Sequence, residues 1–357
     1  MAAIMEILKE AVAAQASDIL ITTGSPITFH IHGNLVPQDP DWLLSATETQ
    51  DLIYQFMTME QRKVFEMERD IDMAYHIPGL ARFRVNVFQQ KGTLAAVLRL
   101  VPLRVPHFSE IGLPEKVILE MASIPGGLVL VTGPTGAGKS TTIASFIEYL
   151  NTEGGVPKHV ITVEDPIEFL FTPQVCVIDQ REIGHDVMSY VRGLRSALRQ
   201  MPHVIFVGEM RDRETIEVAL TAAETGNLVI STLSTQSAAK TINRIIDIFP
   251  LEHQAEIRTR LALTLKVVVA QVLLQRIDVP GRVAARELMF VNSAIANLIR
   301  EGKIHQVNNA IATHARDGMV LMDDSIIDLA ERGVVSHAAA IVRMNDTEKT
   351  SRLKGRR

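Results

Sequence analysis

The sequence predicts an α/β protein with more than one domain, and two observations carry that prediction. After Gly127, short apolar strand candidates alternate with helical segments, at residues 128–132, 159–164, 204–208 and 228–232. Such alternation is typical of a parallel sheet covered by helices. The first hundred residues have a different pattern, in which helices and strands are mixed without alternation. They therefore predict a separate α+β domain.

In the first domain, residues 4–14 and 45–65 have helical spacing, and strands are expected at 17–24, 28–33, 71–77, 81–89 and 94–100. Two prolines follow in residues 101–107, as in an interdomain linker. The predicted divisions are a first domain, a linker, an α/β core, and a C-terminal helical region with a basic tail, at residues 1–101, 102–110, 111–292 and 293–357. We expect the polar, basic tail from residue 347 onward to be disordered.

Composition excludes several classes of function. The 357 residues are 47% hydrophobic and 22% charged, and the net charge of −5 argues against a general nucleic-acid binder. The single cysteine, Cys176, excludes an internal disulfide and a cysteine zinc site. The N-terminus lacks signal-peptide features, and the most apolar window, 261–274, is interrupted by Lys266 and Gln271. We therefore expect a cytoplasmic protein without a transmembrane segment.

The most specific motif is GPTGAGKS at residues 133–140, which fits the phosphate-binding loop pattern G-x-x-x-x-G-K-[ST] between an apolar strand and a helix. Glycines let backbone N–H groups converge on a polyphosphate, and the helix N-terminus adds positive charge. Lys139 would reach the β- and γ-phosphates, and Ser140 would offer its hydroxyl to Mg²⁺. The predicted nucleotide-binding residues of this segment are Gly133, Pro134, Thr135, Gly136, Ala137, Gly138, Lys139, Ser140 and Thr141.

Two acidic residues end apolar strands in the way that phosphate-loop enzymes require. Glu164 follows the run 159–163, and Glu209 follows 204–208. A carboxylate at the C-terminal end of a parallel strand can orient the attacking water, as predicted for Glu164, or hold the Mg²⁺ hydration shell, as predicted for Glu209. We expect both strands to neighbour the loop strand.

Phosphoryl transfer also needs positive charge at the γ-phosphate. Two sets of arginines are candidates, and the sequence leaves both open. One lies on first-domain strands and the other on a helix before Glu209: Arg82, Arg84 and Arg99, and Arg192, Arg195 and Arg199.

Together these residues resemble the secretion-type ATPases, and most closely the PilT-type retraction motors of type IV pili. The resemblance runs from about residue 4 to about residue 311. It includes AIANLIRE at 294–301, similar to the AIRNLIRE motif of retraction motors, with Ala296 where that family has arginine. The other matching segments are 16–18, 81–86, 127–142, 161–169, 180–182, 194–199, 208–212, 222–226 and 237–241. Extension and type II secretion relatives usually carry a four-cysteine zinc subdomain, so the single cysteine favours the retraction branch.

The resemblance implies a PAS-like first domain and a RecA-like core with C-terminal helices, assembled into a homohexamer that uses ATP and Mg²⁺. It implies that Glu164 is the general base and Glu209 the Walker B acid. Arg84 and Arg99 would meet phosphates, and Thr225 would face the neighbouring subunit's nucleotide. The resemblance also implies the function: the motor would lie peripherally at the inner membrane, act on a platform protein in it, and so drive pilus retraction and twitching motility.

Besides Ala296, three positions depart from the family pattern. Asn227 and Ser234 replace two histidines, and His203 replaces an aspartate. The core chemistry is retained, whereas coupling between subunits is open to question. Two alternatives therefore stand beside a primary motor: an accessory retraction ATPase that depends on a partner motor, and a weakly hydrolysing nucleotide-dependent regulatory subunit. A DNA-translocating motor is disfavoured by the acidic charge balance.

Overall fold

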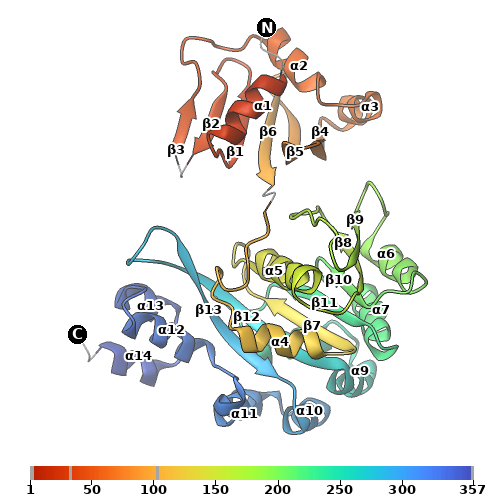
Figure 1. The fold of residues 1–357 in the computed structure, drawn as a ribbon, viewed down its shortest axis with the longest axis vertical. Coiled ribbons are helices and arrows are strands. Elements are labelled where there is room, and N and C mark those ends of the chain that lie inside the picture. Colours follow the sequence, from red (N-terminus) through yellow and green to blue (C-terminus); the bar gives the residue numbers. More distant parts are fainter. Residues whose placement is uncertain (1–3, 32–33, 102–103, 355–357) are drawn as a thin grey trace. The chain divides into compact units, whose positions relative to one another are not determined.

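The computed structural model describes residues 4–31, 34–101 and 104–354, which divide into two compact units (Figure 1). One unit contains the chain up to residue 104 together with 168–170, and the other contains 105–167 and the chain from 171 onward. Residues 32–33 of a predicted strand and 102–103 of the predicted linker lie outside the described residues.

The first unit is built on a six-stranded antiparallel sheet in the order β3-β2-β1-β6-β5-β4. Its strands are β1 (Asp18–Thr22), β2 (Thr28–Ile31), β3 (Asn34–Pro37), β4 (Asp70–Ile77), β5 (Ala81–Gln90) and β6 (Thr93–Val101). Its helices are α1 (Ile4–Ala13), α2 (Ala46–Tyr54) and α3 (Met59–Glu68). Alternate residues of the strands, such as Ile19 and Ile21, join apolar side chains of α1 and α2 in one buried cluster.

The second unit contains a seven-stranded sheet in the order β13-β12-β7-β11-β10-β8-β9. Its strands are β7 (Gly127–Thr132), β8 (His159–Glu164), β9 (Val177–Glu182), β10 (Val204–Val207), β11 (Leu228–Leu233), β12 (Leu265–Gln275) and β13 (Arg282–Phe290). All neighbouring pairs are parallel except β12 and β13, which form an antiparallel hairpin. The α/β fold class predicted from the sequence is confirmed.

Helices cover both faces of this sheet. The helices of the second unit are α4 (Glu115–Ser123), α5 (Lys139–Thr152), α6 (Tyr190–Ala197), α7 (Arg213–Glu224), α8 (Ala238–Asp247), α9 (Leu251–Thr264), α10 (Ser293–Arg300), α11 (Val307–Thr313), α12 (Met322–Glu331), α13 (His337–Arg343) and α14 (Thr347–Lys354). Strand β7 is buried throughout, and its successive side chains alternate between two apolar clusters. Leu128 and Leu130 pack with α6 to α10, whereas Val129 and Val131 pack with α4 and α5.

The predicted disorder of residues 347–357 is wrong for 347–354, which form α14. Leu353 is buried against the cluster formed by α12, α13 and the β12–β13 hairpin. Asp323 of α12 accepts hydrogen bonds from the N–H groups of Asn345 (3.1 Å) and Asp346 (2.7 Å), which hold the chain just before the helix. The burial of Leu353 and these hydrogen bonds together dock a segment that is otherwise polar.

The apolar window at residues 261–274 does not form one element. It contains the end of α9 and most of β12, with the change at Leu265. Across the ranges that the structure describes, no helix combines the length and apolar character needed to cross a membrane.

Candidate active site

The phosphate-binding loop connects β7 to α5 at the C-terminal edge of the sheet. Gly138, with φ of +83°, precedes the first residue of α5, and no side chain caps that helix. Gly133 has φ of +146°, and an added Cβ there would lie 2.3 Å from the carbonyl oxygen of Gln271. The loop therefore requires glycine at both positions, and it leaves the uncapped N-terminus of α5 as a natural site for an anion.

Lys139 lies across the loop. Its Nζ donates to the carbonyl oxygens of Gly133 (2.9 Å) and Pro134 (3.2 Å). Thr135 and Gly136 are exposed at the tip, so this part of the loop is accessible to a ligand. The structure thus brings the predicted loop residues together around one short segment of backbone.

Gln271 of β12 braces this loop, and the sequence analysis noted it only as a polar interruption in an apolar window. Its side chain is 1% exposed. Its Nε2 donates to the carbonyl oxygen of Ala137 (2.6 Å), and its Oε1 accepts from the hydroxyl of Thr142 in α5 (2.9 Å). One buried amide therefore ties the loop and the first turn of α5 to the neighbouring strand.

The two predicted acids lie at the same edge of the sheet. Glu164 ends β8 and is 6% exposed. Its Oε1 accepts from the hydroxyl of Thr162 (2.6 Å) and from Nε2 of Gln180 (3.4 Å), which fix its direction. Glu209 follows β10 and forms an ion pair with Arg211, with 2.8 Å between Oε2 and Nε.

The expectation that both acids neighbour the loop strand is wrong. Strand β11 lies between β7 and β10, and β8 lies beyond β10. At about 4.8 Å per strand, the backbones of β10 and β8 are about 10 and 14 Å from β7. The acids can face a bound γ-phosphate across the end of β11, since all four strands are parallel.

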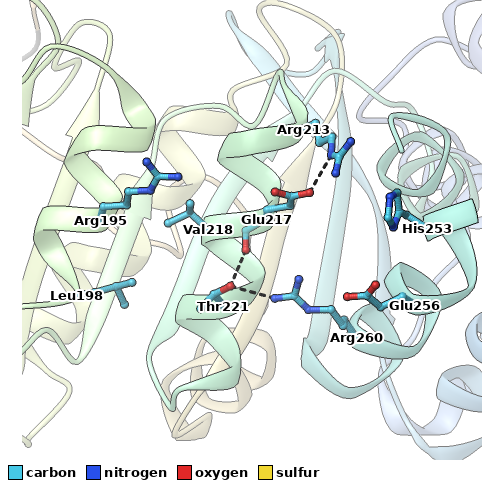
Figure 2. A pocket seen from close by; sticks show the side chains of 9 residues that line it. All are labelled: Arg195, Leu198, Arg213, Glu217, Val218, Thr221, His253, Glu256 and Arg260. Carbon is cyan, nitrogen blue, oxygen red and sulfur yellow. Dashed lines mark hydrogen bonds and ion pairs between the residues drawn. The ribbon is translucent and has the colours of Figure 1, made fainter. Parts of the chain in front are cut away.

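The second set of candidate arginines belongs to α6 and the residues just after it, and the structure pairs Arg195 with an acid of the neighbouring helix. Helix α6 packs on the sheet face opposite α5, and Arg195 forms an ion pair with Glu214 at 2.9 Å. Figure 2 shows Arg195 on the wall of a surface groove formed by α6, α7 and α9. The other residues that line this groove are Leu198, Arg213, Glu217, Val218, Thr221, His253, Glu256 and Arg260. Arg195 is thus part of a charge-paired helix surface.

Arg84 and Arg99 belong to the first unit. They are paired in register on adjacent strands β5 and β6, and both are exposed on the same face. Arg99 also forms an ion pair with Asp18, at 2.8 Å between Nε and Oδ1. Burial raises the pKa of Asp18, but hydrogen bonds from Arg99, Ser17 and His30 outweigh it and lower the pKa overall.

Thr225 lies at the opposite edge of the second unit's sheet, before the N-terminal end of β11. It is exposed, and its hydroxyl accepts from Nδ2 of Asn227 at 3.3 Å. Ser234 follows the other end of the same strand, where Leu233 accepts from the N–H of Gly133 at 3.1 Å. The two positions that depart from the histidine pattern are therefore at opposite ends of β11.

A model of the type II/IV secretion system protein family matches residues 1–353. The type IV pilus retraction ATPase PilT of Pseudomonas aeruginosa is 44% identical over 342 residues, which cover 94% of this chain and 96% of PilT. The type IV pilus ATPase PilU of the same organism is 34% identical over 338 residues, covering 94% and 87%. A crystal structure of the pilus retraction motor PilT with bound ADP superposes with a TM-score of 0.92, at 43% identity, covering 99% of this chain and all of the other.

Proposed function

The chain belongs to the type II/IV secretion system protein family, and we propose that it is an ATP-hydrolysing motor that drives retraction of type IV pili. The observation that carries the proposal is the joint geometry of the loop edge. A complete phosphate-binding loop and a buried, oriented carboxylate, Glu164, lie at the same edge of one parallel sheet.

A cavity beside the loop supports a whole nucleotide as the ligand. It has a volume of about 870 Å³ and is bordered by Gly138, Thr141 and Thr142 on one side and by the β12–β13 hairpin on another. The triphosphate would lie along the loop with its γ-phosphate toward Glu164, so that the nucleoside would extend toward this cavity.

The donors at the site suit Mg²⁺. Mg²⁺ usually keeps several waters and is held by one or two carboxylates together with substrate phosphates. Within the described residues no three His, Cys, Asp or Glu side chains gather as a metal site, which fits a metal carried in by the nucleotide. Ser140 would ligate the ion directly and Glu209 would bind its waters, and the ion would neutralise phosphate charge.

Hydrolysis then needs a base and a cation. Glu164 would orient and deprotonate the attacking water. Arg84 and Arg99 present positive charge on one face of the first unit, and in the assembled motor they would meet the phosphates. Thr225 lies at the edge opposite its own loop, so it would act on the nucleotide of a neighbouring subunit.

The assembly we propose is a homohexameric ring on the cytoplasmic side of the inner membrane, acting on a pilus platform protein. A closed ring gives every subunit the same neighbour, as the role of Thr225 requires. Of the two relatives, PilT is named a retraction ATPase and PilU only a type IV pilus ATPase. The higher identity to PilT, 44% against 34%, favours the primary motor.

The test compares wild type with Glu164→Gln in steady-state ATP hydrolysis. We expect ATP binding near the wild-type level and turnover about 10²–10⁴-fold lower, since a general base contributes on that scale. Glu252→Gln, on an exposed residue of α9, is the matched control and should keep full turnover. A wild-type chain without ATP turnover contradicts the proposal and favours the regulatory subunit.

Fibre retraction in a deletion strain tests the motor role. The wild-type gene should restore retraction, and the Glu164→Gln gene should not. Restoration that occurs only when a second retraction motor is present favours the accessory alternative.

A further inference from the structure

Helix α6 packs close to the acidic strand ends, and two glycines permit this. A Cβ added at Gly193 of α6 would lie 2.8 Å from Cγ1 of Val163, the residue before Glu164. A Cβ added at Gly208, the residue before Glu209, would lie 2.8 Å from the hydroxyl oxygen of Tyr190. Tyr190 is the first residue of α6, so its hydroxyl is held where β8 and β10 end.

The surroundings of this hydroxyl are mostly anionic. Burial, and then the carboxylates of Asp165, Glu209 and Glu164, raise the pKa of Tyr190, while the Arg211 guanidinium opposes them. The side chain therefore stays protonated and remains a hydrogen-bond donor. Among the residues that the structure describes, this hydroxyl has no hydrogen-bond partner.

We propose that Tyr190 is a further catalytic residue for ATP hydrolysis, whose hydroxyl donates a hydrogen bond to the water that Glu164 activates. This inference rests on the proposed function. Thr162 and Gln180 fix the carboxylate of Glu164, and Tyr190 supplies the second contact that sets the direction of the water. A water held from two sides loses less freedom on reaching the transition state.

The chemical step balances without proton transfer from Tyr190. The water oxygen forms a bond to the γ-phosphorus, and Glu164 accepts a proton from that water. The bond from the γ-phosphorus to the bridging oxygen breaks, and ADP leaves with the electron pair. Tyr190 keeps its proton and contributes only orientation.

The test is Tyr190→Phe, which keeps the ring and removes the hydroxyl. We expect the turnover number per ADP-binding site to fall about fivefold, the value of one hydrogen bond, with KM and ADP affinity unchanged. Tyr149→Phe is the control, because Tyr149 of α5 packs edge-on against Phe108 and should keep wild-type turnover. Counting ADP-binding sites restricts the comparison to folded protein.

A double-mutant cycle separates a catalytic role from a structural one. In the Glu164→Gln background, the added Tyr190→Phe change should lower turnover less than twofold, since both residues act on the same water. The same fivefold loss in both backgrounds overturns the inference, as does a change in KM alone. Wild-type turnover in Tyr190→Phe overturns this inference and leaves the motor intact. A wild-type chain without ATP turnover overturns both.

Discussion

The two edges of the sheet in the second unit differ in how their polar groups are held, and β11 connects them. At its C-terminal end, Leu233 bonds to Gly133 of the phosphate-binding loop, next to Ser234. At its N-terminal end, Asn227 bonds to the exposed Thr225. At about 3.3 Å per residue, the seven steps from Asn227 to Ser234 span about 23 Å. The two ends therefore belong to different surfaces of one subunit.

The two histidine positions of the family pattern therefore fall on edges that can serve different purposes. The loop edge is braced by the buried Gln271, as a site that positions phosphates requires. At the opposite edge, the side chains of the exposed Thr225 and the half-buried Asn227 donate to carbonyl oxygens at the end of α7, where a neighbouring subunit could contact them. We infer that the loop edge carries chemistry and that the opposite edge carries coupling. Variants of each edge should therefore affect different measurements.

The largest effect is expected at the loop edge, from Lys139→Ala. The change removes the cation that we propose faces the β- and γ-phosphates, so ATP affinity should fall by at least about 100-fold, the scale of two charge-assisted hydrogen bonds. A fluorescent-nucleotide titration measures it, and Lys240→Ala on an exposed residue of α8 is the control. An ATP affinity equal to that of the wild type would contradict the assignment of phosphate binding to the loop edge.

Gln271→Leu should have the next largest effect. The change removes the hydrogen bonds that Gln271 makes to the buried carbonyl of Ala137 and to the buried hydroxyl of Thr142. Each loss lowers stability by about 1–3 kcal/mol. We expect ATP affinity about tenfold weaker and a lower thermal midpoint. Gln275→Leu, at the exposed end of the same strand, should change neither quantity. Equal affinities for the two variants would show that β12 does not brace the loop.

Local patterns in the sequence were sufficient to predict most residues of the loop edge. The fully buried β7, the glycines and the acids that end β8 and β10 each follow from a short run of residues. Strand order does not, because no local pattern places β11 between β7 and β10.

The parts of the fold that sequence analysis missed are elements with weak or merged patterns. Strand β9 is largely polar, since it is the last strand of its sheet. Helix α9 runs directly into β12, and no glycine or proline marks the boundary at Leu265. The role of Gln271 was missed for the same reason, because it depends on a contact across 134 residues of chain.

The smallest effects are expected from restoring histidine at the two ends of β11, one at a time. Histidine at either position introduces a group whose ordinary pKa is about 6.5, so its charge is present below that pH and lost above it. Ser234→His adds this charge beside the subunit's own loop. Its turnover should therefore acquire a new pH dependence between about 5.5 and 7.5 at every protein concentration.

Asn227→His should behave differently, because it adds the charge at the edge that we propose faces a neighbouring subunit. We expect turnover to change about two- to threefold, and to acquire the same pH dependence, only at protein concentrations where rings form. Steady-state ATPase assays at two concentrations, with light scattering for ring formation, measure both variants. Asn308→His, exposed on α11, is the control. The contrary result is a pH-dependent turnover of Asn227→His in dilute monomer and none in Ser234→His. It would reverse the two assignments, because a group about 23 Å away along β11 would then control the loop of its own subunit.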